Sequence, residues 1–130
     1  HPYFTTPGHT REARELLGEG PLLAPEQKVI LEENPAKARA IARPALGFYK
    51  GAANYAANFR RMGFGDDDLA GEGSDRLVDA LFAYGTPRAI RTRVGEHLSA
   101  GADHVCLQLL PSSGADLLSG YRAIAEELFS

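Results

Sequence analysis

Apolar residues along this chain form two patterns: a helical spacing, and short runs in which apolar residues are neighbours. In the helical spacing they recur three or four positions apart, which places them on one face of a helix. This spacing predicts helices over 7–18, 35–43, 52–62, 75–85, 87–101 and 117–128. The last helix carries its apolar stripe on Leu117, Tyr121, Ile124 and Leu128. The chain is therefore rich in amphipathic helices that require a common core.

Continuous apolar runs predict three strands: HPYF at 1–4, QKVIL at 27–31 and HVCLQLL at 104–110. Each run is followed by a helical stretch, and repeated β-α units build parallel sheets. Parallel sheets are covered on both faces, which suits runs as apolar as these. The pattern therefore predicts an α/β fold with about three parallel strands, too few to close a barrel.

Local signals mark where the predicted helices start and stop. Three starts share a capping side chain followed by proline: Thr6-Pro7, Asn34-Pro35 and Thr86-Pro87. Pro44 predicts a kink or a restart within the helical stretch around it. The polar stretch FGDDDLAGEGS at 64–74 has no periodicity, so we expect a loop there.

Length and charge limit the class of protein. A chain of 130 residues with 44% hydrophobic and 24% charged residues suits one globular domain. A net charge of -3 without a basic stripe argues against nucleic acid as a partner. The apolar runs fall far short of the ~20 residues that span a bilayer, so we expect no membrane segment. The first ten residues lack the charged and apolar regions of a signal peptide.

Cysteine, histidine and carboxylate positions predict neither a disulfide nor a metal site. The single cysteine, Cys106, stands inside an apolar run, so we expect a buried thiol in a reducing, cytoplasmic compartment. His97 and His104 lie seven positions apart, without a cysteine or aspartate at ligand spacing. The GDDD stretch at 65–68 lacks the alternating oxygen ligands of a calcium loop.

Four segments carry a family resemblance when taken together: HPYFTTPGHTREARELLG, PLLAPEQKVILEENPAKARAIAR, YAANFRRMGF and SDRLVDALFAYGTPRAIRTRVGEHLSAGADHVCLQLL. As a set they resemble the luciferase-like monooxygenase superfamily, in its branch of flavin- and deazaflavin-dependent (coenzyme F-420) oxidoreductases. The resemblance implies a (β/α)8 TIM barrel, which takes about 250 residues. Residues 1–130 would then be its C-terminal half, with the N-terminal half outside this chain and 104–110 as the eighth strand. It also implies an inserted helical segment through Tyr49, Tyr55 and Phe59 near the active-site end.

Barrel enzymes carry their sites at the C-terminal ends of strands, which singles out a few residues here. His1 and Tyr3 end the first predicted strand, where they would contact substrate or the cofactor ring, or else pack against a neighbouring strand. Gln108 lies in an apolar strand and either binds a cofactor or satisfies neighbouring backbone. We expect Gln108 to share the barrel-interior face with Cys106, while Leu107 and Leu109 meet the outer helices.

The loop after the last predicted strand offers a weaker candidate. Ser112, Ser113 and Gly114 precede the final helix, and loops in this position hold phosphate groups in many barrels. The competing interpretation is simple N-capping of that helix by Ser112 or Ser113. The resemblance favours capping, because it implies that loops of the other half hold the cofactor phosphate.

Taken together, these observations predict an oxidoreductase that transfers a hydride between a deazaflavin coenzyme and a small organic substrate. The alternatives are an FMN-dependent monooxygenase and an inactive truncated or proteolysed fragment. In every case we expect the isolated chain to bind cofactor weakly and to associate with a second copy or with the missing half. The reason is that a half barrel would leave part of one apolar set exposed: Val29, Ile30, Leu31, Val105, Leu107 and Leu109.

Overall fold

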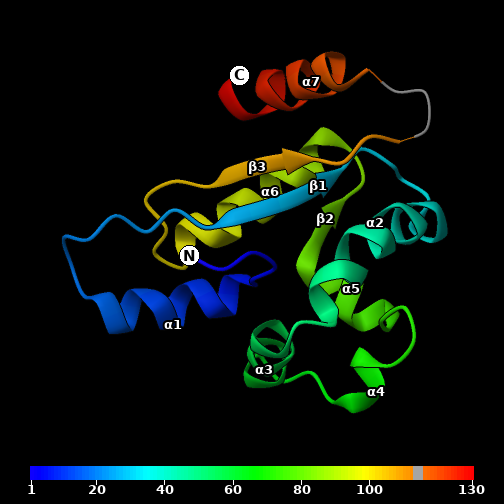
Figure 1. Cartoon of the computed structure of the whole chain (residues 1–130). Helices are drawn as coiled ribbons and strands as arrows, with labels where there is room; N and C mark the ends of the chain where they lie inside the picture. Colours follow the sequence, from blue (N-terminus) through cyan, green and yellow to red (C-terminus); the bar gives the residue numbers. More distant parts are fainter. Residues whose placement is uncertain (113–115) are drawn as a thin grey trace.

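A computed structural model describes residues 1–112 and 116–130 and shows a mixed α/β fold (Figure 1). Helices alternate with short strands along the chain. The elements are α1 (Pro7–Leu17), β1 (Glu26–Ile30), α2 (Pro35–Lys50), α3 (Ala53–Arg61), α4 (Asp66–Leu69), α5 (Asp75–Leu81), β2 (Phe82–Tyr84), α6 (Pro87–Ser99), β3 (Cys106–Leu109) and α7 (Leu117–Phe129). Among the described residues, no helix is both long and apolar enough to cross a membrane.

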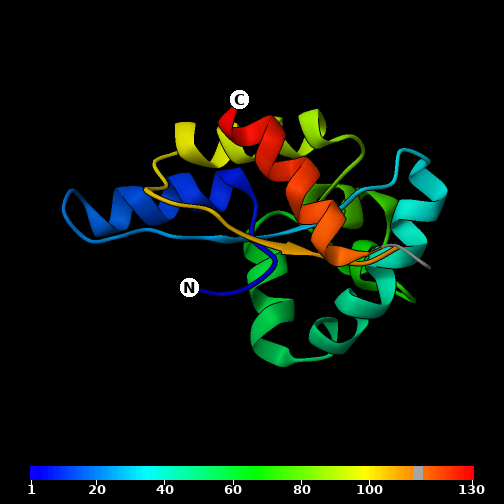
Figure 2. The same cartoon turned by 90° about the horizontal axis from the view of Figure 1, so that it is seen from above.

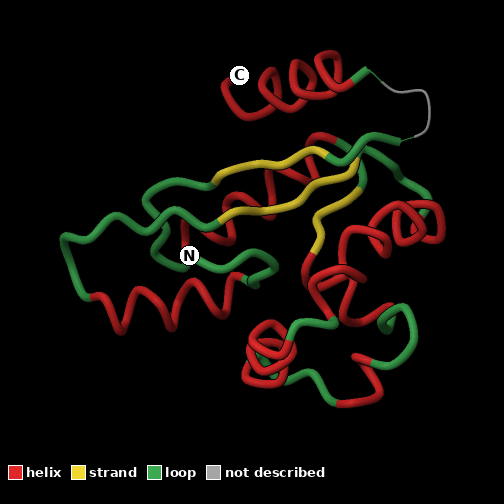
Figure 3. The backbone as a smooth tube through the Cα atoms, viewed as in Figure 1, coloured by secondary structure: helices red, strands yellow, loops and turns green. Residues whose placement is uncertain are grey.

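The strands form one parallel sheet in the order β2-β1-β3, with β1 in the centre (Figures 1 and 3). Lys28 of β1 pairs with Phe82 on one side and with Gln108 on the other. The predicted parallel α/β architecture is confirmed. The last two predicted strands, at 27–31 and 104–110, do contain strands, and these strands are neighbours in the sheet as expected.

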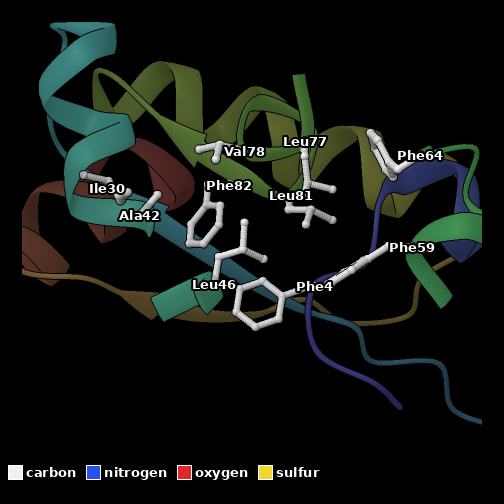
Figure 4. Packing of buried hydrophobic residues seen from close by; sticks show 10 residues of the cluster. All are labelled: Phe4, Ile30, Ala42, Leu46, Phe59, Phe64, Leu77, Val78, Leu81 and Phe82. Carbon is white, nitrogen blue, oxygen red and sulfur yellow. The ribbon is translucent and has the colours of Figure 1, made fainter. Parts of the chain in front are cut away.

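Two apolar clusters lie on opposite faces of this sheet. On one face Val29 and Leu109 pack with Ile90 of α6 and Ile124 of α7. The other cluster is larger and joins the sheet to α2, α3 and α5 through Phe4, Ile30, Ala42, Leu46, Phe59, Phe64, Leu77, Val78, Leu81 and Phe82 (Figure 4). Viewed from above, α1, α6 and α7 lie on one side of the strands and α3 on the other (Figure 2).

The predicted helix starts are confirmed by their hydrogen bonds. The side chains of Thr6, Asn34 and Thr86 each accept from a backbone N–H three residues on, at 3.1 to 3.3 Å. Pro44 does not interrupt α2, which runs from residue 35 to residue 50. Both Pro44 and Ala40, whose carbonyl loses its helical donor there, are exposed, so this break in the hydrogen-bond ladder lies on the solvent side of the helix.

The first predicted strand is wrong, and a strand that the pattern hid takes its place. Residues 1–4 are not a strand: Phe4 adopts a φ of 56°, which breaks an extended run. Instead the stretch predicted as a helix over 75–85 stops at Leu81, and Phe82–Tyr84 forms β2 along the free edge of β1. The apolar stripe continues into Phe82, so spacing alone does not reveal the change from helix to strand.

Two further expectations are corrected. The polar stretch 64–74 contains the short helix α4, because Asp68 accepts from the backbone N–H of Gly65 and closes a helical turn. Cys106 is exposed rather than buried, because its side chain lies on the face of β3 opposite α6 and α7. The apolar run around Cys106 predicted the strand correctly but not which positions the helices cover.

The side-chain register of β3 agrees with the prediction. Leu107 and Leu109 pack in the cluster under α6 and α7, whereas Gln108 is exposed on the opposite face. The expected large apolar exposure is wrong, however. Within the set Val29, Ile30, Leu31, Val105, Leu107 and Leu109, every residue is buried or half-buried. The helices α2 to α5 cover the part of the second sheet face near Ile30. These six residues therefore do not leave an apolar face that a partner would have to cover.

Candidate functional site

A buried lysine occupies the centre of the second sheet face. The Nζ atom of Lys28 donates to Glu26 Oε1 at 2.9 Å and to Gln108 Oε1 at 2.8 Å. It also lies 4.5 Å from the ring centroid of Tyr3 and 4.6 Å from that of Phe4. We call these five residues the Lys28 cluster. Only 5% of the Lys28 side chain is exposed, so nearly the whole charge is removed from water.

Three separate parts of the chain build this cluster. Glu26 and Lys28 are two positions apart on β1 and therefore share a face, and the parallel register sets Gln108 beside Lys28. The N-terminal segment brings the rings: the left-handed turn at Phe4 directs its side chain into the core, where it meets Phe82 at 5.5 Å. Tyr3 rests edge-on against Tyr49 and remains 43% exposed.

The Lys28 cluster provides partners for the charge of the lysine, but it leaves one oxygen of the glutamate without a hydrogen-bond donor. A buried ammonium group is tolerated only when its donors are satisfied, and here two oxygens and two ring faces surround it. Burial raises the pKa of Glu26, although the hydrogen bond from Lys28 opposes that rise. The second carboxylate oxygen, Glu26 Oε2, is buried and has no partner within the described part of the chain. The cluster thus retains one unused acceptor.

Two of the three residues predicted for the cofactor or substrate lie in this cluster. Tyr3 and Gln108 both contact Lys28, although neither contact was expected. His1 lies outside it: the ring is exposed, its Nδ1 atom is 2.8 Å from the carbonyl oxygen of Pro2, and it packs against His9. Lys28 itself was missed. The available signal was a lysine inside a predicted buried strand, two positions from a glutamate.

The C-terminal ends of β1 and β3 border a second, shallower feature. A cavity of about 420 Å³ lies between Glu32, Lys37 and Ser112, over Ala40 and Ile41. The start of α7 beside it is not capped by Ser112. Asp116 accepts from the N–H groups of Leu118 and Ser119, so a carboxylate already occupies the position that a phosphate would take. Ser113 and Gly114 lie outside the described residues.

A third polar group is wholly enclosed under α6. His97 is 0% exposed, with Nε2 at 3.0 Å from Gln27 Oε1 and Nδ1 at 2.8 Å from Thr10 Oγ1. The amide nitrogen of Gln27 donates to the carbonyls of Lys28 and Leu81, so its oxygen accepts from His97. Nε2 therefore carries the proton and Nδ1 accepts from Thr10. Burial, with the nearby Arg93 charge, lowers the pKa of His97 to about 4.

The remaining candidates for a binding site are a cavity beside α2 and a cluster of metal-binding side chains. A cavity of about 570 Å³ beside α2 includes Lys50 in its wall, but Nζ of Lys50 donates to the carbonyls of Leu69 and Gly71. Within residues 1–112 and 116–130, no three histidine, cysteine or acidic side chains are grouped so that they would hold a metal ion.

The described residues do not by themselves fit a deazaflavin or a flavin. Such a cofactor needs a slot for its planar ring and a cradle of donors for its phosphate. Tyr3 and Gln108 offer one wall on an open sheet face, while the carboxylate of Asp116 caps the N-terminus of α7. Searches of protein-family models, of curated proteins and of solved structures find no match to this chain.

Proposed function

We propose that this chain is part of a luciferase-like oxidoreductase that transfers a hydride between a deazaflavin coenzyme and a small organic substrate. The proposal starts from the four segments that resemble this superfamily. It is supported by parallel strands that alternate with helices. The position of β2 on the other edge of β1 differs from a barrel, in which consecutive strands are neighbours. In a complete barrel another strand would take that edge.

The observation that carries the proposal is the difference between the two faces of β3. One face lies under helices, as the outside of a barrel does, through Leu107 and Leu109. The other exposes Cys106 and Gln108 beside the enclosed charge of Lys28. A polar, partly open face suits the interior of a barrel whose remaining strands bring further groups. Such strands, or a second copy of the chain, would complete the binding site in a cytoplasmic enzyme.

Within this proposal the role of Lys28 is to orient Gln108. The ammonium group only donates hydrogen bonds, so the amide oxygen of Gln108 must face it. The two N–H donors of the amide then point away from Lys28, toward the group that would cover this face of β3. A ring carbonyl of the cofactor is an acceptor of suitable chemistry for these donors. The cofactor supplies the hydride chemistry, and these residues would position it and exclude water.

Cofactor titration tests the proposal. The chain alone and the full reading frame that encodes it are each titrated with coenzyme F-420 and with FMN, following fluorescence. We expect the full reading frame to bind coenzyme F-420 with micromolar or better affinity, about -8 kcal/mol, and the chain alone to bind much more weakly. Preference for FMN would instead favour the monooxygenase. Absence of binding to either would contradict the proposal and favour an inactive fragment.

A pair of variants on one strand face sharpens the test. In the full reading frame, Gln108→Leu removes the amide donors, and we expect roughly tenfold weaker cofactor binding, the effect of about 1.4 kcal/mol. Cys106→Ser changes an exposed neighbour on the same face and serves as the matched control. Equal effects of the two variants would show that Gln108 does not contact the cofactor.

A further inference from the structure

Helix α1 is attached to the rest of the molecule in an unusual way. Its one buried residue is polar, Thr10, while its apolar Leu16 is 89% exposed. Its side chains form hydrogen bonds with distant segments: Thr10 with His97, and Arg14 with Gly101 and Asp103. By contrast α7, which also packs against α6, buries Ile124 and Leu128 in the apolar cluster. The position of α1 therefore depends on polar groups.

The hydrogen bond between Thr10 and His97 joins α1 to a buried imidazole whose surroundings disfavour a positive charge. His97 is fully buried, and both of its ring nitrogens have partners in the neutral state. Its neighbour on β1 is the neutral Gln27, whereas the charged Glu26 and Lys28 lie on the opposite sheet face. A proton added to His97 would therefore have no buried carboxylate beside it.

The charged groups that face His97 oppose a second positive charge. On α6 the guanidinium of Arg93 reaches the same Gln27 oxygen at 3.5 Å, and its own counter-ion is Glu96. On α1 the nearest titratable group is His9, whose pKa burial also lowers. Protonated His97 still has acceptors in Thr10 and Gln27, so desolvation and repulsion, rather than lost hydrogen bonds, oppose protonation.

We propose that the contact between α1 and α6 is an acid-sensitive latch, in which uptake of a proton by His97 releases α1 while β1, β3 and α7 stay folded. Release of α1 admits water to the imidazolium and removes the burial that opposes its charge. Few apolar contacts are lost, because Leu16 and Leu17 already face solvent. The latch is independent of any cofactor chemistry.

Hydrogen exchange of the full chain, followed by mass spectrometry at pH 7 and pH 4.5, tests the latch. One proton taken up between a pKa of about 4 in the closed state and 6.5 in the open state lowers α1 protection factors by up to about 50-fold. Protection of β3 and α7 should change by less than about threefold. Equal loss across α1, β3 and α7 would show global unfolding and overturn the proposal, as would unchanged protection of α1.

Two variants assign the effect to one side chain. His97→Gln keeps a neutral side chain at every pH, so we expect the pH-dependent loss of α1 protection to disappear. His104→Gln replaces an exposed histidine and should leave the loss unchanged. If His97→Gln does not fold, the wild-type protection factors of α1, compared with those of β3 and α7, still test the proposal. Retention of the pH step in a folded His97→Gln variant would overturn the proposal.

Discussion

Strand β1 sends neighbouring side chains to two faces that are stabilised in different ways. Gln27 and Val29 point to the face under α6 and α7, where apolar packing surrounds one neutral hydrogen-bonded group. Glu26 and Lys28 point to the other face, where an ion pair lies beneath aromatic rings. Burial alone therefore does not decide whether a polar group is charged. The available partners decide it.

The two faces also respond to acid in opposite directions. The pKa of Glu26 is raised by burial, so its ionisation costs stability as the pH rises. The pKa of His97 is lowered to about 4, so its protonation costs stability as the pH falls. Strand β1 therefore lies between Glu26, whose raised pKa favours mild acid, and His97 of α6, whose lowered pKa opposes acid.

The largest effect is expected from breaking the ion pair. Lys28→Met leaves Glu26, whose side chain is only 14% exposed, without its cation. We expect the free energy of unfolding to fall by about 3–5 kcal/mol, measured by urea denaturation. The double variant Glu26→Gln/Lys28→Met should recover more than half of this loss. Lys37→Met replaces an exposed lysine and is the control; a loss below about 1 kcal/mol for Lys28→Met would contradict the assignment.

Neighbouring residues on β3 compare the two faces directly. Leu109→Ala opens a cavity under α6 and α7 and should destabilise the fold by about 3 kcal/mol. Gln108→Ala removes one acceptor from Lys28 and should cost only about 1 kcal/mol. Thermal and urea unfolding of both variants measure the difference. A greater cost for Gln108→Ala would mean that the polar face dominates stability.

The acid response follows from His97. Its folded-state pKa lies below the ordinary value of 6.5, so the unfolded chain binds the proton more tightly. Its contribution is fully present above pH 6.5 and is lost between pH 6.5 and pH 4, by at most about 3 kcal/mol. Urea denaturation across this range measures the slope. We expect His97→Gln to flatten it; an unchanged slope would assign the acid response to other groups.

A smaller effect concerns how closely α7 approaches the sheet. A Cβ atom at Gly120 would lie 2.5 Å from Leu109 Cδ2, so Gly120→Ala forces that side chain to move. We expect a loss of about 1–2 kcal/mol in the free energy of unfolding. Gly95→Ala in α6 is the matched control, since no atom lies within 4 Å of its Cβ. It should stabilise the protein by about 0.5–1 kcal/mol, and a similar gain at Gly120 would disprove the close packing.

Part of the candidate site was predictable. Gln108 stood out because a polar side chain in an apolar strand requires a partner, and Tyr3 stood out because it ends the first predicted strand. Their meeting at Lys28 was not predictable, since it depends on the pairing of β1 with β3 and on the left-handed turn at Phe4. His1 was selected by the same reasoning, yet it lies outside the cluster because residues 1–4 do not form a strand.

The helix starts, the parallel α/β class and the alternation of side chains along β3 follow from the sequence alone. These features depend on local capping, spacing and the two-residue period of a strand. The pairing of Phe82–Tyr84 with β1, the exposure of Cys106 and the burial of His97 depend instead on how the chain folds in three dimensions. Each of these outcomes depends on which distant segment covers a residue, and such contacts leave no periodic mark in the sequence.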